Sequence, residues 1–450
     1  MSDLEHGYLV FRGVECVYTK TDDYMYLIPR DKDRQSELFK YAFNKNFMLE
    51  FSTSIYKRCY AYVENCTMGL DNSLKLQIKY YVRLIDNEGF NSMEMTGDDI
   101  DIFFNPSSYF FRRRDNIKTN PIDLIYDNHI ANSFEFIYKN ERIQVDLCYG
   151  NILRNGIASD LKLHPSLFIR FTKTNSIEKI HGIYSTIVKF LQLVRHQTDC
   201  NLLPTNLYGE INNKFSRLGV LYERVYQTNY NWTGDAEYAY FEPYINQLLQ
   251  FIADNGNLNL NYFPNREYNS FDYDMKRYLT IFAAFEYECR QAPEKYERIS
   301  DNEVMGIREE LKEVIRNFKQ QGITESEKKF LDMAYQSISR LGTQFGQNRK
   351  IINAFIENEE PLRNSMKNIF PRGCNIQGIA SSLVNLRGKI VHSNLYKNLN
   401  DEEIMNIRFL DILTYVMMLK RSGIDNDGIE LIIGVIFHCN FKYMDYKLNT

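Results

Sequence analysis

An arginine and a histidine stand five positions apart near the end of the chain, in the segment Arg387-Gly388-Lys389-Ile390-Val391-His392. Histidine exchanges protons near neutral pH, and arginine grips phosphate oxygens with a bidentate fork and stabilises negative charge. RNA cleavage needs both functions when a ribose 2′-OH attacks the neighbouring phosphate. The pair therefore suits cleavage of RNA without a metal ion.

Apolar spacing predicts that this pair lies in or beside a helix over residues 379–391, with Leu383 and Leu386 on its apolar side. At about 100° per residue, five positions place the two side chains roughly 140° apart. They do not stack on one face, but the long Arg387 side chain can bend over the intervening turn toward a groove shared with His392. Because one histidine does not easily act as both base and acid, we expect a second copy in a symmetric dimer to complete the site.

Arginine and histidine are common on helices, so the spacing alone would also fit a helix that merely ends in cationic residues. Two longer segments are more specific. Residues 383–392 (LVNLRGKIVH) resemble the signature of HEPN domains (higher eukaryotes and prokaryotes nucleotide-binding), which is Arg, four to six residues, then His, late in a helical bundle. Residues 282–290 (FAAFEYECR) are similar to an early helix of the ApeA-like branch, where an Ala-apolar-Glu step precedes Arg.

This resemblance implies a dimeric, metal-independent endoribonuclease of bacterial anti-phage defence, acting by abortive infection, with Arg387 and His392 as its catalytic pair. The partners it implies are RNA, with tRNA as one candidate, a second copy of the chain, and a phage-derived trigger. It implies no cofactor. Glu286 becomes a candidate for orienting the pair across the bundle, with an i,i+4 ion pair to Arg290 as the alternative.

Three further residues of the segment have open roles. Asn385 and Lys389 either contact RNA or are simply solvated helix residues. Active HEPN members often carry a polar residue, commonly Asn, directly after the arginine, whereas this chain has Gly388. Glycine costs a helix about 1 kcal/mol relative to alanine. We expect Gly388 either to permit a close backbone approach or to loosen this turn.

Composition limits what else the chain can do. The formal net charge is −4, so RNA contact requires a local basic patch. Two candidates are residues 112–114 (Arg-Arg-Arg) after two phenylalanines, and Arg349-Lys350, which we expect between two helices; the alternative for both is ordinary solvated surface. The sequence has no phosphate-binding glycine loop, HExxH, GxSxG or kinase motif. Eight cysteines without a CxxC pair indicate buried free thiols in a reducing cytosol rather than a metal site.

Hydrophobic periodicity divides the chain in two. We expect an α+β domain rich in antiparallel strands over residues 1–265, with a sensing or regulatory role, and an all-α, HEPN-like bundle over residues 272–450. An Asn-rich stretch (255–261) and Pro264-Asn265 mark the break. The predicted strands are residues 7–11, 61–63, 74–80, 100–104, 134–138, 143–147, 166–171, 203–211 and 220–226, and the predicted helices are 176–195, 241–254, 275–290, 304–318, 330–345, 379–391, 401–420 and 429–437.

The N-terminus lacks the basic and apolar segments of a signal peptide, and the longest apolar stretches, such as residues 429–437, are too short to span a bilayer. We therefore expect a cytoplasmic protein without membrane contact. Two rival interpretations of the Arg/His pair stay open. One is a non-catalytic HEPN scaffold that binds RNA, a nucleotide or a partner protein, and the other is a pair of interface residues that hold a dimer together.

Overall fold

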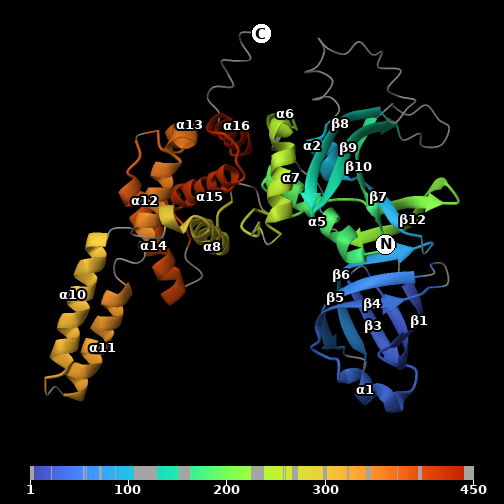
Figure 1. Cartoon of the computed structure of the whole chain (residues 1–450), viewed down its shortest axis with the longest axis horizontal. Helices are drawn as coiled ribbons and strands as arrows, with labels where there is room; N and C mark the ends of the chain where they lie inside the picture. Colours follow the sequence, from blue (N-terminus) through green and yellow to red (C-terminus); the bar gives the residue numbers. More distant parts are fainter. Residues whose placement is uncertain are drawn as a thin grey trace, which may run out of the picture. The chain divides into compact units, whose positions relative to one another are not determined.

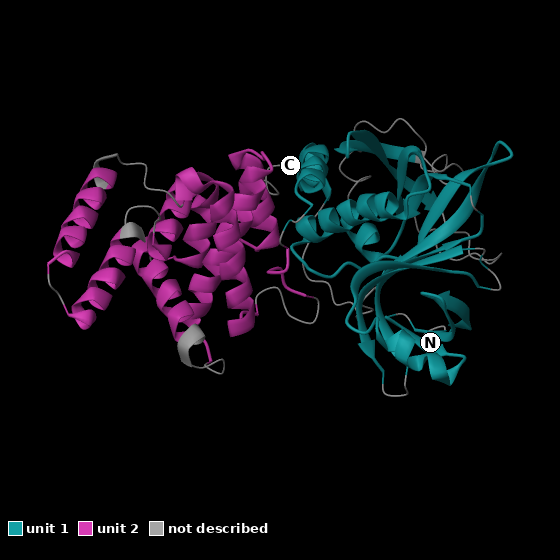
Figure 2. Cartoon of the chain, turned by 60° about the horizontal axis from the view of Figure 1, so that its bottom comes forward, with its two compact units in different colours: residues 1–232, 236–258 teal, residues 233–235, 259–450 magenta. Residues whose placement is uncertain are grey.

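A computed structural model describes residues 5–21, 23–53, 56, 58–69, 73–86, 88–105, 129–151, 163–223, 238–256, 258, 260–265, 272–296, 302–321, 324–340, 346–371, 373–393 and 398–439. For residues 129, 151, 163, 302–304, 339–340 and 390–393 it describes the backbone alone. The chain forms two compact units, one of residues 1–232 and 236–258 and the other of residues 233–235 and 259–450 (Figure 2). An α+β unit rich in antiparallel strands is thus followed by an all-helical one, as the periodicity predicts.

Unit 1 is built on one twelve-stranded antiparallel sheet. Its strands are β1 (Glu5–Phe11), β2 (Val14–Lys20), β3 (Tyr24–Pro29), β4 (Lys45–Phe51), β5 (Arg58–Met68), β6 (Leu74–Leu84), β7 (Phe90–Met95), β8 (His129–Tyr138), β9 (Glu141–Asn151), β10 (Leu163–Thr174), β11 (Thr205–Ile211) and β12 (Lys214–Glu223). The helices of this unit are η1 (Lys32–Arg34), α1 (Gln35–Phe39), α2 (Asp98–Phe103), α5 (Ile177–Arg195), α6 (Tyr238–Phe241), η2 (Glu242–Tyr244) and α7 (Ile245–Asp254).

Strand β6 joins two parts of this sheet. Its first half pairs with β3 and its second half with β12, while β5 pairs along its whole length. Leu74, Leu76 and Ile78 are buried, as their alternation with polar residues predicts. One part runs β1-β2-β3-β6-β5-β4 around a core that includes Leu27 and Val63, and the other runs β12-β11-β7-β10-β9-β8 (Figure 1).

Helix α7 covers the edge strand β8. The Asn246 Oδ1 atom accepts a hydrogen bond from the Glu135 amide at 3.0 Å, and Gln250 Oε1 accepts one from the Ile137 amide at 2.7 Å. Gln250 Nε2 also donates to the Ile137 carbonyl at 3.3 Å. These side chains satisfy backbone groups that would otherwise offer an open sheet edge to another chain.

Two local predictions in unit 1 are wrong. Residues 100–104, predicted as a strand, mostly belong to helix α2, which buries Ile100 and Phe103 and is followed directly by the buried Phe104. A run of five residues fits both the two-residue period of a strand and the 3.6-residue period of a helix, so the pattern alone does not distinguish the two. The strands predicted at 134–138 and 143–147 leave four residues between them, whereas the β8–β9 hairpin has a connection of two residues. Lys139 and Asn140 both have positive φ (48° and 65°), as a tight type I′ turn requires.

Unit 2 is all-helical among its described residues. Its helices are α8 (Met275–Gln291), α9 (Pro293–Tyr296), α10 (Asn302–Lys319), α11 (Glu325–Arg340), α12 (Gln347–Glu357), α13 (Glu359–Ile369), α14 (Ile376–Ser393), α15 (Asp401–Arg421) and α16 (Asn426–Ile436). Six of them match predicted helices, although Leu341 and Phe345, expected at the end of α11, lie outside the described residues. No helix in the described part of the chain is both long and apolar enough to cross a lipid bilayer.

The sequence does not predict α9, α12 and α13. Pro361 marks a break in the pattern, yet it stands third in α13, in the first turn, where a backbone N–H has no helical partner to lose. Arg349 and Lys350 lie in the first turn of α12 rather than between helices, and Lys350 is buried. The prediction that Arg349 and Lys350 form an exposed basic pair is therefore wrong for Lys350.

Helix α15 is the centre of this bundle and is buried on nearly all sides from Asn406 to Leu419. It begins with a capping box in which Asn400 and Glu403 satisfy each other's backbone amides. Two ion pairs attach it to α8. Arg277 Nη2 lies 2.8 Å from Asp411 Oδ2, and Arg421 contacts both carboxylate oxygens of Glu288 at 2.9 Å.

Candidate functional site

Helices α8 and α14 position the residues of the Arg/His segment. The Tyr278 hydroxyl, on α8, donates a 2.6 Å hydrogen bond to the backbone carbonyl of Leu383 on α14. Burial raises the pKa of Tyr278 well above its ordinary value, so the hydroxyl keeps the proton that it donates. Leu383 and Leu386 are buried beside this contact. The face of α14 that carries Leu383 and Leu386, four residues and one residue before Arg387, is thereby held against the bundle.

Arg387 is held from two sides. Its Nη2 atom lies 3.1 Å from Glu286 Oε1, and its guanidinium carbon lies 4.9 Å from the centre of the Phe282 ring. Both partners come from α8, one turn apart. The Arg387 side chain is 40% exposed, whereas that of Glu286 is only 19% exposed. The cation is therefore anchored by a carboxylate and an aromatic face while part of it stays open to solvent.

A third helix fixes the carboxylate. Gln347, the first residue of α12, donates from Nε2 to the same Glu286 Oε1 atom at 2.7 Å. Sequence reasoning missed this residue because α12 itself was not predicted, and a single glutamine carries no signal of its own. With Glu286 bonded from α12 and α14 together, its rotamer is constrained before any ligand arrives.

The alternative partner for Glu286 does not take its carboxylate. Arg290 Nε donates instead to the Glu286 backbone carbonyl, at 3.1 Å. Glu288, two residues after Glu286, points to a different element and pairs with Arg421 on α15. Burial raises the pKa of Glu288, and the Arg421 cation opposes that rise. Of the two carboxylates on this turn, Glu286 is thus the one that serves Arg387.

The other residues of the segment are placed less completely. Asn385, Gly388 and Lys389 are exposed on α14, so neither polar side chain is confined to the core. His392 lies in the last turn of α14, and its side chain lies outside the described residues. The structure therefore unites Arg387 with Glu286, and His392 follows on the same helix.

Gly388 has open space around it. A Cβ atom added there would meet no described atom within 4 Å, apart from the helix itself, so close backbone approach within one chain does not explain the glycine. We expect Gly388→Ala to stabilise unit 2 by about 0.5–1 kcal/mol, because alanine loses less backbone entropy in a helix. Amide hydrogen exchange of α14 in the intact chain measures this. Destabilisation would instead show that a partner or ligand needs the open space beside Gly388, which the alanine side chain would fill.

Other groups singled out in the sequence contribute little to this site. The arginine run at residues 112–114 lies outside the described residues. No described group of three or more His, Cys, Asp or Glu side chains has the arrangement of a metal site. All eight cysteines are free thiols, of which Cys374 is exposed, Cys148 and Cys200 are half-buried, and the rest are buried.

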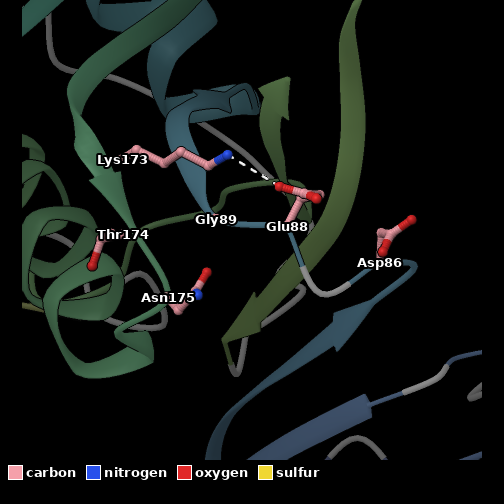
Figure 3. A pocket seen from close by; sticks show the side chains of 6 residues that line it. All are labelled: Asp86, Glu88, Gly89, Lys173, Thr174 and Asn175. Atoms are coloured by element: carbon pink, nitrogen blue, oxygen red, sulfur yellow. Dashed lines mark hydrogen bonds and ion pairs between the residues drawn. The ribbon is translucent and has the colours of Figure 1, made fainter. Parts of the chain in front are cut away.

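A polar cavity of about 430 Å³ lies in unit 1, between the β6–β7 connection and the end of β10 (Figure 3). It is lined by Asp86, Glu88, Gly89, Lys173, Thr174 and Asn175. The Lys173 amine lies 3.1 Å from Glu88 Oε2, which neutralises one of its two carboxylates. This composition supplies neither a nucleophile with a base nor a concentrated set of metal ligands.

The Arg387–Glu286 contact thus remains the described arrangement with the clearest chemical use, an oriented cation that can bind an anionic oxygen. No known protein family, curated protein or solved structure matches this chain.

Proposed function

We propose that the chain is a metal-independent endoribonuclease of the HEPN type. The observation that supports this most is the anchored guanidinium of Arg387, held by Glu286 and Phe282 yet 40% exposed, on the helix that also carries His392. Arg387 has five N–H donors, and its side chain retains solvent access after pairing with Glu286.

In the proposed reaction the ribose 2′-oxygen forms a bond to the adjacent phosphorus, and the bond from phosphorus to the 5′-oxygen breaks. The 2′-OH proton passes to a histidine, and a protonated histidine gives one to the leaving 5′-oxygen. His392 and its counterpart in a second copy supply these two roles. Arg387 binds the phosphate oxygens and stabilises the charge of the pentacoordinate state. The products are a 2′,3′-cyclic phosphate and a 5′-hydroxyl.

Glu286 and Gln347 are positioning residues in this scheme, since they act through Arg387 rather than on RNA. The biological setting comes from the resemblance to ApeA-like proteins. The chain would be a cytoplasmic abortive-infection effector that cleaves host or phage RNA, with tRNA as a candidate. A phage-derived trigger would act through unit 1, which senses infection or restrains the nuclease.

His392→Asn tests the function directly. Under phage challenge, we expect bacteria that express the wild-type chain to accumulate RNA fragments with cyclic-phosphate ends, and bacteria that express the variant to accumulate none. His438→Asn is the matched control, because His438 is exposed in the same unit and has a positive φ (50°) that asparagine tolerates. The control should behave as wild type.

The purified chain separates the remaining alternatives. Cleavage in EDTA at catalytic amounts, lost in His392→Asn, supports the nuclease. RNA binding without cleavage by the purified chain at near-stoichiometric amounts, together with intact RNA in expressing cells under phage challenge, would contradict it and favour a scaffold. A change in molecular mass caused by His392→Asn, with RNA cleavage unaltered, would assign the residue to an interface instead.

A further inference from the structure

Helices α10 and α11 form an antiparallel hairpin (Figures 1 and 2). On α10, the side of Arg308, Lys312, Ile315 and Lys319 faces its partner, and Lys319 pairs with Asp332 of α11. Tyr335 of α11 lies within 6.0 Å of three cations of α10, and its hydroxyl accepts a 3.2 Å hydrogen bond from Arg316. The two helices are therefore held together mainly by long polar side chains.

The apolar side chains of this hairpin lie elsewhere. Among the described residues of α10 and α11, Ile315 is the one that is buried, with 8% of its surface exposed. Six large apolar residues, which we call the hairpin face, are between 45% and 66% exposed: Ile307, Leu311, Val314, Phe318, Phe330 and Met333. Those of α10 recur at intervals of four, three and four residues, the spacing of a coiled-coil seam.

Helix geometry puts these residues on one side of the hairpin. Ile307, Leu311, Val314 and Phe318 each precede by one residue a position that faces α11, so they lie about 100° around α10. Phe330 precedes Leu331, which is half-buried on the side of Tyr335, in the same way. Because the two helices run in opposite directions, a step of one residue back from a facing position leads to the same side of the hairpin on both helices. The face is thus continuous across α10 and α11.

We propose that the hairpin face binds the same face of a second copy of this chain. Six side chains of this size, each about half exposed, present on the order of 600 Å² of apolar surface, which is at the upper end of the range for the largest apolar patch on a typical soluble monomer. A stable interface buries about 800 Å² per partner, of which about 65% is apolar in homodimers. The hairpin face therefore has the size that a dimer needs.

Symmetry and charge favour a second copy over an unrelated partner. Two hairpins packed face to face about a twofold axis form a four-helix bundle, the usual way for such helices to bury their apolar sides. Residues 302–340 contain seven Lys or Arg and seven Asp or Glu, so the hairpin has no net charge to oppose self-association. The same neutrality and the apolar character make RNA a poor occupant.

This inference concerns oligomeric state and does not rest on ribonuclease activity, although the proposed mechanism uses a second copy. The test is the mass of the full chain by light scattering. Wild type should have twice the 53.4 kDa of one chain. Leu311→Glu and Phe330→Glu should each weaken the dimer at least about 30-fold, the change expected at a central interface residue.

Matched controls are Asn317→Glu and Gln336→Glu, which introduce the same charge at exposed positions outside the hairpin face. They should leave the mass of wild type unchanged. Because Leu311 and Phe330 are already exposed in one chain, their variants should retain wild-type circular dichroism, which excludes simple unfolding. The proposal is wrong if wild type is monomeric at 50 µM, a concentration of about the dissociation constant of a weak complex. It is also wrong if both face variants remain dimers.

Discussion

Arg387→Lys should lower RNA cleavage at least about 100-fold while the helical unit remains folded. Lysine keeps the positive charge but loses the planar fork that holds two phosphate oxygens at once. Removing one pre-oriented donor to a developing oxyanion typically costs two to three orders of magnitude in rate. Stability should change little, since the Arg387 side chain is 40% exposed.

The measurement is the initial rate of cleavage of a short RNA under the conditions in which wild type is active. Arg363→Lys is the matched control, because Arg363 is exposed on α13 of the same unit. It should cleave as wild type does. If Arg387→Lys retained the wild-type rate, the guanidinium would have no part in the transition state, and the proposed reaction would lose its main support.

Asp411→Ala should destabilise unit 2 by about 3–5 kcal/mol, the cost of removing one partner of a buried ion pair. Asp411 is fully buried and receives bonds from Arg277 Nη2 at 2.8 Å and from the Tyr273 hydroxyl at 3.1 Å. The Arg277 side chain is only 9% exposed and lies 4.2 Å from the Tyr273 ring centre. Alanine would leave a buried cation and a buried hydroxyl without their acceptor.

Amide hydrogen exchange of α8 and α15 measures this loss in the intact chain, which avoids treating two units as one unfolding transition. Asp427→Ala, which removes an exposed carboxylate from the first turn of α16, is the control and should cost less than about 1 kcal/mol. Exchange in Asp411→Ala no faster than in this control would mean that the pair adds nothing to the stability of the bundle.

Local periodicity determines much of the architecture. The alternation in residues 74–80 specifies a half-buried strand, and the spacing in Ile177–Arg195 specifies a helix with one apolar side. Such patterns can be recognised in the sequence because the buried residues of one helix or strand recur at the period of that element. Where a run is short, as in Asp98–Phe103, or contains a proline, as in Glu359–Ile369, the local signal is ambiguous and the surrounding packing decides.

For the candidate site, the sequence by itself places Arg387 in a helix and His392 five residues later, at or just after the end of that helix; the structure extends the helix to Ser393. Only the tertiary structure decides that Glu286, rather than Glu288, serves Arg387, because the choice depends on which side of α8 meets α14. The contact of Gln347 with Glu286 and the exposure of the hairpin face are likewise decided only by the tertiary structure. A polar residue or an apolar stripe looks alike in sequence whether or not another element covers it, since contacts between distant segments leave no local period.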